Sequence, residues 1–207
     1  TEDREARVFA RILFDHFEET YPDFSQVRRF FHFVDANIGA KNLRSIFNDS
    51  YLLKTTMKCV CLLDGDQKEN LDQYTITLPG GNSPEKVIMD YALCLYDNDS
   101  PFWTAPAILD LNYGKVHFRD NIKPDIDAIP STLRELREEG KSIHGVERDL
   151  RKKAFTKHQR FFELLFKHWV NDPENADAIQ LFYKRLNIMF KKVAEFYGIN
   201  PKVWTAN

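Results

Sequence analysis

The sequence predicts a mixed α/β fold, in which a mainly parallel sheet is flanked by helices and followed by a helical C-terminal extension. Segments with apolar residues at helical spacing alternate with short apolar runs in the first half, which is typical of parallel sheets. One run, 58–63, is continuously apolar after Lys58, as expected for a strand buried on both faces. Long amphipathic segments dominate the last third. We therefore expect a core with an irregular insert over 1–130, and a helical extension packed on that core over 131–207.

The first elements are bounded by turn residues. Apolar residues recur at helical spacing over 4–19, until a Tyr-Pro pair ends the helix. The aromatic and β-branched run 29–34 predicts a strand. After a glycine, the spacing over 41–53 predicts a second helix.

Two strands and a helix follow. The run 58–63 stops at an Asp-Gly-Asp turn, and the run 74–78 stops at Pro-Gly-Gly. Asn82 or Ser83 is expected to cap a helix that reaches about residue 96, with Pro84 in its first turn.

The second half of the chain begins irregularly and ends in helices. Segment 97–130 contains four prolines, which predict a long connection with one hairpin. The hairpin strands are expected at 107–111 and 115–118, and helices at 131–139, 146–170 and 176–197.

Cysteine usage and the start of the chain indicate the compartment. Cys59, Cys61 and Cys94 are odd in number and lack the C-x-x-C spacing of a zinc site, so we expect buried free thiols in a reducing cytoplasm. No apolar run approaches the length of a membrane span. The chain opens at Thr1 without an initiator Met or a signal peptide, from which we expect a fragment of a larger cytoplasmic protein.

Charge is distributed unevenly along the chain. Residues 141–207 hold 13 Lys and Arg against 7 Asp and Glu, whereas residues 1–140 hold 16 against 24. This asymmetry suits a metal site beside a phosphate-binding surface, although ordinary solvated helix faces give the same pattern. Contacts to phosphate dominate nucleic-acid affinity. The residues predicted to form a phosphate-binding track are Arg148, Arg151, Lys152, Lys153 and Arg160.

Asp64 and Asp66 are the sharpest chemical feature. They follow the strand 58–63, and ligands of open α/β sheets bind at the carboxyl ends of strands. Gly65 between them allows the backbone to bend. Two neighbouring carboxylates suit Mg²⁺, which is usually held by a few carboxylates, waters and substrate phosphate.

Glu2 offers a third carboxylate. It lies directly before the helix 4–19, at the expected carboxyl end of a strand that precedes Thr1. The first and third strands of a doubly wound sheet can lie side by side, so Glu2 is predicted to converge with Asp64 and Asp66. There it would ligate the metal or act as a general base.

These residues resemble the Toprim family. The acidic start at Glu2, the segment 34–39 and the Leu63-Asp64-Gly65-Asp66 turn are similar to Toprim domains of topoisomerases, primases and overcoming-lysogenization-defect (OLD) nucleases. The OLD branch is the most similar. The resemblance covers residues 1–97 and, more loosely, 145–207. It departs at Asp3, where the family usually has glycine, and at Leu62, where it often has serine.

The resemblance implies further site residues and a cofactor. Glu5 and Glu85 are implied as metal ligands beside Glu2, Asp64 and Asp66. Mg²⁺ or Mn²⁺ is implied, as two ions, one helping to activate water and the other steadying the leaving oxygen. Lys157 is implied as a catalytic lysine that offsets charge on the phosphate.

The implied function is a metal-dependent endonuclease or nickase of DNA, within a larger ATPase–nuclease of antiphage defence. The chain has no G-x-x-x-x-G-K-[ST] loop, so an ATPase domain or subunit is expected outside it, bringing homo-oligomerisation. Three alternatives stay open. They are a Toprim nuclease that cleaves RNA or tRNA, a phosphoryl-transfer enzyme with Asp64 as nucleophile, and a non-catalytic partner-binding module.

Overall fold

The chain folds as two compact units. The computed structural model describes residues 1, 3–34, 39–49 and 58–205. The first unit comprises Thr1–Pro84 and Phe166–Asn207, and the second unit comprises Glu85–Leu165. This division differs from the expected one at residue 130, because the chain leaves the first unit at the start of one helix and re-enters it within another.

A small parallel sheet lies in the first unit. β1 (Cys61–Leu63) pairs in parallel with β2 (Thr75–Thr77), with Cys61 opposite Thr75 and Leu63 opposite Thr77. Both strands fall within the predicted apolar runs, and their parallel pairing confirms that prediction. All three residues of β1 are buried, as its continuous apolar sequence requires.

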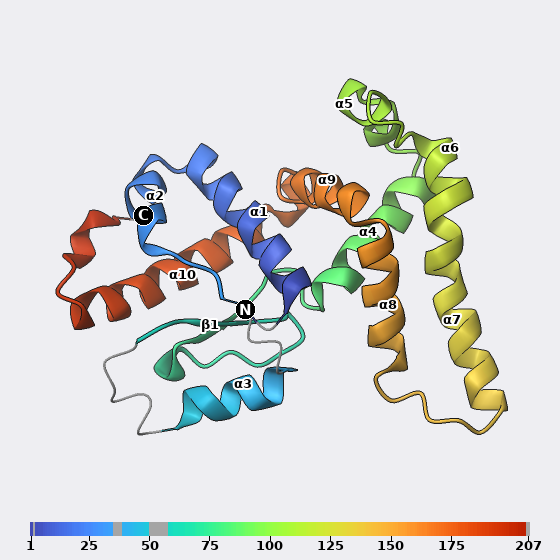
Figure 1. Ribbon diagram of the computed structural model, residues 1–207. Helices are drawn as coiled ribbons and strands as arrows, with labels where there is room; N and C mark the ends of the chain where they lie inside the picture. The colour runs from blue at the N-terminus through green and yellow to red at the C-terminus, as the bar shows by residue number, and fades with distance from the viewer. Residues whose placement is uncertain (2, 35–38, 50–57, 206–207) are drawn as a thin grey trace. The chain divides into compact units, whose positions relative to one another are not determined.

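Helices lie on both sides of this sheet. α3 (Gly39–Asn48) packs Leu43 against Cys61 and Leu63. α10 (Ala176–Phe196) contacts β2 and lies on the other side of the strands from α3 (Figure 1). The helix predicted over 41–53 is confirmed as far as residue 48, and its continuation from residue 50 lies outside the described residues.

Aromatic side chains form the core of the first unit. The C-terminal end of α1 (Arg4–Thr20) packs against α10, and the ring of Phe17 lies 4.9 Å from that of Tyr183. Trp204 is fully buried, 5.3 Å from the ring of Phe24, and its indole N–H donates to the Tyr183 hydroxyl at 2.8 Å. The predicted first and last helices are thus confirmed.

The predicted strand 29–34 is wrong. After α1 the chain forms α2 (Pro22–Val27) and a 3-10 helix over Arg28–Phe30, and then continues to residue 34 without regular structure. The Phe31 ring packs edge-on against Phe14 with ring centroids 5.1 Å apart. Packing between aromatic rings, rather than pairing of strands, therefore accounts for the course of this segment.

Every regular element of the second unit is helical. The Phe118 ring at its core lies 4.9 Å from Trp103 and 5.7 Å from Phe161. The helix predicted to reach residue 96 is confirmed by α4. In chain order the elements are α4 (Pro84–Asp97, whose first residue belongs to the first unit), a 3-10 helix over Pro101–Thr104, α5 (Pro106–Leu109), α6 (Lys115–His117), a π-helix over Phe118–Ile122, α7 (Lys123–Glu138), α8 (Val146–Lys157) and α9 (Gln159–Trp169, which continues into the first unit).

The predicted hairpin over 107–118 is wrong. Its two segments form α5, and α6 with the following π-helix. Their backbone hydrogen bonds are local: the Ile108 N–H donates to Ala105 C=O at 2.9 Å, and the Phe118 N–H donates to Gly114 C=O at 3.1 Å. Pro106 lies in the first turn of α5, where its fixed φ favours a helix.

α7 begins earlier than the predicted helix 131–139. Pro124 lies in its first turn, where a missing N–H is harmless. Pro130 lies inside the helix, a position that normally breaks one. The Ser131 hydroxyl donates to Ala128 C=O at 2.9 Å in the turn around this proline.

The single helix predicted over 146–170 is two helices. His158 separates α8 from α9, with φ −116° and ψ 26°. Its Nε2 lies 2.6 Å from Asp125 Oδ2 on α7. The contact with Asp125, 33 residues away in sequence, thus lies at the boundary between the two helices. Helical periodicity alone does not indicate this boundary.

The described chain is mostly helical with one small parallel sheet, which is compatible with a mixed α/β fold but has only two strands. Cys59, Cys61 and Cys94 are free thiols, as predicted. Cys59 and Cys94 are exposed, so the prediction that all three are buried is wrong. Among the described residues, no helix combines the length and apolar character needed to cross a bilayer.

Candidate metal centre

The Asp-Gly-Asp turn directly follows β1, but its two carboxylates differ in exposure. Asp64 is buried, with 7% of its surface exposed. Asp66 is exposed and accepts a hydrogen bond from the Gln67 side-chain amide at 2.8 Å. Asp64 is therefore the member of the predicted pair that the fold encloses.

Gly65 holds this turn against the loop that follows β2. A Cβ at Gly65 would lie 2.9 Å from the backbone of Leu78, Gly81 and Asn82, so only glycine fits. The Gly65 N–H also donates to Asn82 C=O at 3.1 Å. The loop leads directly into α4, so the end of β1 and the start of α4 are fixed together.

Two more carboxylates lie at the start of α1. Asp3 caps the helix, with its Oδ1 accepting from the Ala6 N–H at 2.9 Å. Glu5 lies in the first turn, and both side chains are buried. Glu2, the predicted ligand and base, lies outside the described residues.

Glu85 is the most deeply buried carboxylate in the described chain. It lies in the first turn of α4, and only 1% of its surface is exposed. An anion is favoured there by the helix dipole. The Lys152 ammonium on α8 lies 4.0 Å from Glu85 Oε1.

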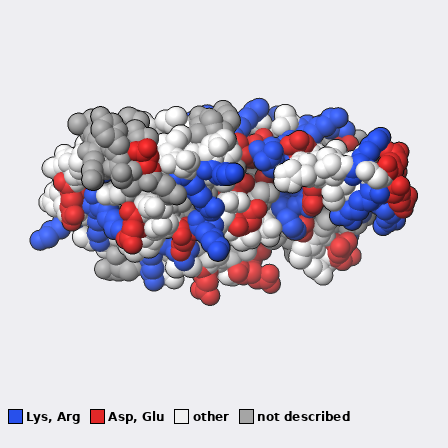
Figure 2. All heavy atoms as spheres, turned by 90° about the horizontal axis from the view of Figure 1, so that it is seen from below, with Lys and Arg blue, Asp and Glu red and all other residues white. Residues whose placement is uncertain are grey.

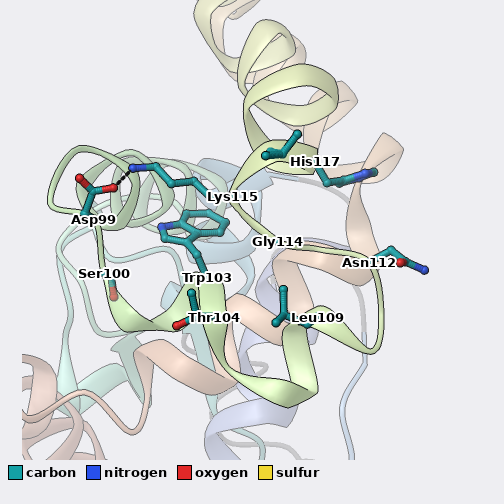
Figure 3. Close-up of a pocket in the computed structure, with 10 residues that line it drawn as sticks. Asp99, Ser100, Trp103, Thr104, Leu109, Asn112, Gly114, Lys115 and His117 are labelled. Carbon is teal, nitrogen blue, oxygen red and sulfur yellow. Dashed lines mark hydrogen bonds and ion pairs between the residues drawn. The ribbon is translucent and has the colours of Figure 1, made fainter.

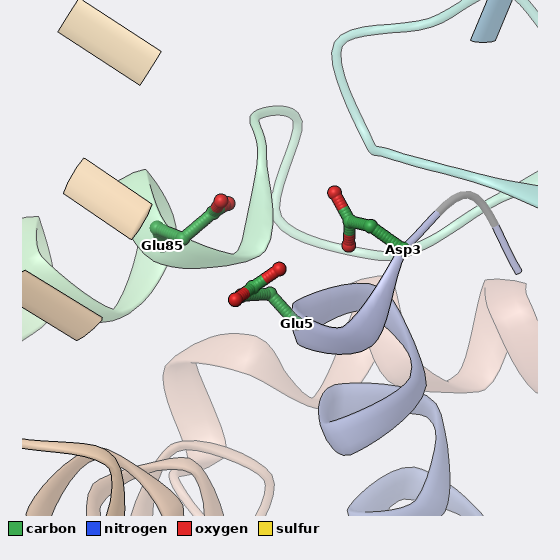
Figure 4. Close-up of side chains that lie close together, drawn as sticks. All are labelled: Asp3, Glu5 and Glu85. Atoms are coloured by element: carbon green, nitrogen blue, oxygen red, sulfur yellow. The ribbon is translucent and has the colours of Figure 1, made fainter. Parts of the chain in front are cut away.

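Asp3, Glu5 and Glu85 form a group that we call the carboxylate cluster. One oxygen from each lies within 4.8 Å of the other two (Figure 4). Glu85 lies in the first turn of α4, directly after Pro84, which is the last residue of the first unit's N-terminal segment. Within α4, only this first turn contributes to the cluster. The predicted ligands Glu5 and Glu85 are thus brought together, and Asp64 is not a member.

Asp3 was not among the predicted ligands. The sequence signal available for it was an N-cap, because an Asp directly before a helix usually serves that purpose. The cap uses Oδ1. Grouping with Glu85 depends on residues 82 positions apart in sequence, which no local pattern reveals.

The cluster has the chemistry of a hard-cation site. Carboxylate oxygens are the preferred ligands of Mg²⁺ and Mn²⁺. Carboxylates are almost never buried unless paired or bound to a metal. Six polar or charged residues are buried in the described chain, and four of them are the carboxylates Asp3, Glu5, Asp64 and Glu85. The donor set therefore fits a divalent cation.

No protein-family model, curated protein or solved structure matches this chain.

The two lysines of interest have different surroundings within the second unit. Lys157 is exposed, and its ammonium lies 2.6 Å from Asp125 Oδ2, which also contacts His158. Burial opposes ionisation of Asp125, but hydrogen bonds from Lys157 and His158 outweigh it and lower the pKa of this carboxyl. Lys152, which is predicted to bind nucleic acid, lies beside Glu85.

Most cations of the predicted phosphate-binding track are paired with carboxylates. Arg148 pairs with Asp149 and Arg151 with Glu147. Lys153 and Arg160 are exposed. Acidic and basic side chains are interspersed on the face seen in Figure 2. The expected basic surface is therefore largely neutralised by its own neighbours, although the exposed pair of Arg148 and Asp149 is weak and exchanges readily for other anions.

A separate open pocket of about 460 Å³ lies in the second unit (Figure 3). Trp103 and Leu109 form its apolar wall. Lys115 on its rim pairs with Asp99, and the Lys115 ammonium lies 4.6 Å from the centre of the Tyr96 ring. None of the predicted site residues lines this pocket.

Proposed function

We propose that the chain is the Toprim-like part of a Mg²⁺-dependent endonuclease that nicks or cleaves DNA. The observation that carries the proposal is the carboxylate cluster, in which the implied ligands Glu5 and Glu85 lie together with Asp3. Asp64 adds a buried carboxylate at the carboxyl end of a parallel strand, where α/β folds bind ligands.

The side chains have distinct roles in this proposal. Glu5 and Glu85 would hold Mg²⁺ with a carboxylate oxygen of Asp3, while Asp64 and the predicted Glu2 and Asp66 would complete the ligand set. When bound, Mg²⁺ would polarise the phosphoryl oxygen and lower the pKa of a bound water. Lys157 is the implied phosphate lysine, and it would exchange Asp125 for the substrate. Lys152 is the lysine beside a carboxylate of the cluster.

The rest of the assembly is part of the same proposal. The chain would work in the cytoplasm with an ATPase domain or subunit in antiphage defence, and would form homo-oligomers through that part. DNA would contact the track of Arg148, Arg151, Lys152, Lys153 and Arg160, by displacing weak surface ion pairs. RNA, including tRNA, is the alternative substrate.

Cleavage of supercoiled plasmid in Mg²⁺ or Mn²⁺ tests the proposal. The wild-type chain, Glu85→Gln, Asp64→Asn and Asp90→Asn are compared, with an RNA substrate in parallel. Asp90 is the matched control, because it lies on α4 like Glu85 but is exposed and paired with Lys86. We expect nicking by the wild type and Asp90→Asn, and a loss of at least about 10²-fold in the other two.

The same assay should be run on the chain joined to its ATPase part. Failure of that assembly to cleave either nucleic acid would refute the nuclease proposal. Equal loss in Asp90→Asn would show that the variants act through general damage to α4.

A further inference from the structure

Glu85 has a positively charged neighbour on another helix. Lys152 Nζ lies 4.0 Å from Glu85 Oε1, within the second unit. The two residues differ in access to solvent: the side chain of Glu85 is 1% exposed and that of Lys152 is 29% exposed. The pair therefore joins a fully enclosed anion to a cation that reaches the surface.

The distance between the two groups shows what kind of contact this is. Direct charge-assisted hydrogen bonds from nitrogen to oxygen are about 2.7–2.9 Å long. At 4.0 Å, Lys152 balances the charge of Glu85 without a hydrogen bond to that oxygen. The ammonium group sits on a flexible four-carbon stem. Such a contact can be exchanged without rearranging α8.

Lys152 also stands out from its neighbours. Arg148 and Arg151 pair with carboxylates on their own helix. Lys153, the next residue, is exposed. Lys152 alone among these four pairs with a carboxylate of the cluster, so its charge bears on whatever the cluster binds.

We propose that Lys152 competes with the divalent cation for Glu85. Before the ion binds, the Lys152 ammonium balances the buried carboxylate. A divalent ion that ligates Glu85 repels the ammonium and takes over its role. The inference rests on the proposed function, and it adds that the fold sets metal affinity low by supplying its own cation.

Metal affinity measured directly tests this competition. Mn²⁺ alone is titrated into the full 207-residue chain, and free Mn²⁺ is followed by electron paramagnetic resonance. The variants are Lys152→Gln, Lys152→Arg and the matched control Lys153→Gln, each checked for folding by circular dichroism. Removing a positive charge near the ion should tighten binding by about tenfold in Lys152→Gln, because unscreened like charges repel at this range. Lys152→Arg and Lys153→Gln should bind as the wild type does.

A second measurement keeps the proposal testable if Lys152→Gln does not fold. The lysines of the wild-type chain are reductively ¹³C-methylated, and Mg²⁺ is added. The Lys152 signal, assigned from Lys152→Arg, should shift on binding while that of Lys153 stays in place.

The possible outcomes separate the two proposals. If the wild type binds Mn²⁺ and Lys152→Gln binds it equally well or more weakly, the competition is overturned but the metal site is not. An unmoved Lys152 signal at saturating Mg²⁺ does the same. Absence of Mn²⁺ binding by the wild type overturns the metal site itself, and the competition with it.

Discussion

The two units differ in how many carboxylates they bury. The first unit buries three carboxylates, Asp3, Glu5 and Asp64, in addition to its apolar core. The second unit keeps its charges on the surface in pairs such as Lys86–Asp90 and Lys123–Asp127, and buries Glu85 at its first position.

This difference distinguishes exposed ion pairs, which contribute to folding stability, from buried carboxylates, which lower it. Exposed pairs contribute about 0–1 kcal/mol each and can be replaced with little effect. Burying a carboxylate carries a desolvation penalty of several kcal/mol, so a fold under selection for stability alone would avoid it. Buried carboxylates gathered at the starts of two helices therefore point to binding of a cation.

Truncation of the aromatic core should have the largest effect on stability. Trp204 is fully buried among Phe24, Tyr183 and Phe190. Trp204→Ala should lower the free energy of unfolding by about 3–5 kcal/mol, as for other large-to-small core substitutions. Urea denaturation measures this. A loss below 1 kcal/mol would mean that the aromatic core does not carry the stability of the first unit.

Neutralising a buried carboxylate should leave stability intact and remove function. Glu5→Gln should lower Mg²⁺-dependent cleavage by at least about 10²-fold, because even outer-shell partners of metal ligands are worth about 10–100-fold. In EDTA its melting temperature should equal or exceed that of the wild type, since a like charge within the cluster is gone. Mg²⁺ should raise the melting temperature of the wild type only. A strongly destabilised Glu5→Gln in EDTA would assign Glu5 a structural role.

Local sequence patterns predicted the regular elements of the fold best. The spacing of apolar residues located α1, α4 and α10, and the buried run before Asp64 located β1. The strand predicted over 29–34 and the hairpin predicted over 107–118 are wrong, because tertiary packing decides the conformation of short apolar segments. In the first of these segments, the Phe31 ring packs edge-on against Phe14 instead of lying in a strand.

For the candidate site too, local sequence patterns predict some features and miss others. Asp64 and its glycine were evident from a turn at the end of an apolar run. The contact of Lys152 with Glu85 joins residues 67 positions apart, and depends on how α4 and α8 pack. No pattern within either helix specifies that packing, so the sequence predicted Lys152 only as one cation of a track.

Acid should weaken the first unit through two histidines. Burial lowers the pKa of His168, against an opposing effect of Asp172, and burial also lowers the pKa of His16. Histidines with a lowered folded pKa contribute stability above their unfolded pKa of about 6.5, and this is lost as the pH falls through the folded pKa. The free energy of unfolding should therefore fall from pH 7.5 to pH 5.5. His168→Gln should show a smaller fall, measured by urea denaturation at both pH values, and parallel pH profiles would contradict this assignment.

The smallest effect is expected for a surface ion pair of the second unit. Asp90→Asn breaks the contact with Lys86, whose ammonium lies 2.5 Å from Asp90. Exposed pairs of this spacing on a helix contribute about 0.3–0.5 kcal/mol. Chemical denaturation should thus detect less than about 0.5 kcal/mol of change. A decrease of more than 1 kcal/mol in the free energy of unfolding would contradict the assumption that surface pairs contribute little to stability.

The central claim is that the carboxylate cluster holds a divalent cation. The most direct test is an anomalous difference map from crystals of the full chain grown with Mn²⁺. The claim predicts a peak about 2.0–2.2 Å from carboxylate oxygens of Glu5 and Glu85, close to the distances for Mg²⁺. Absence of a peak there at saturating Mn²⁺, or a peak only at exposed residues such as Asp66, would contradict it.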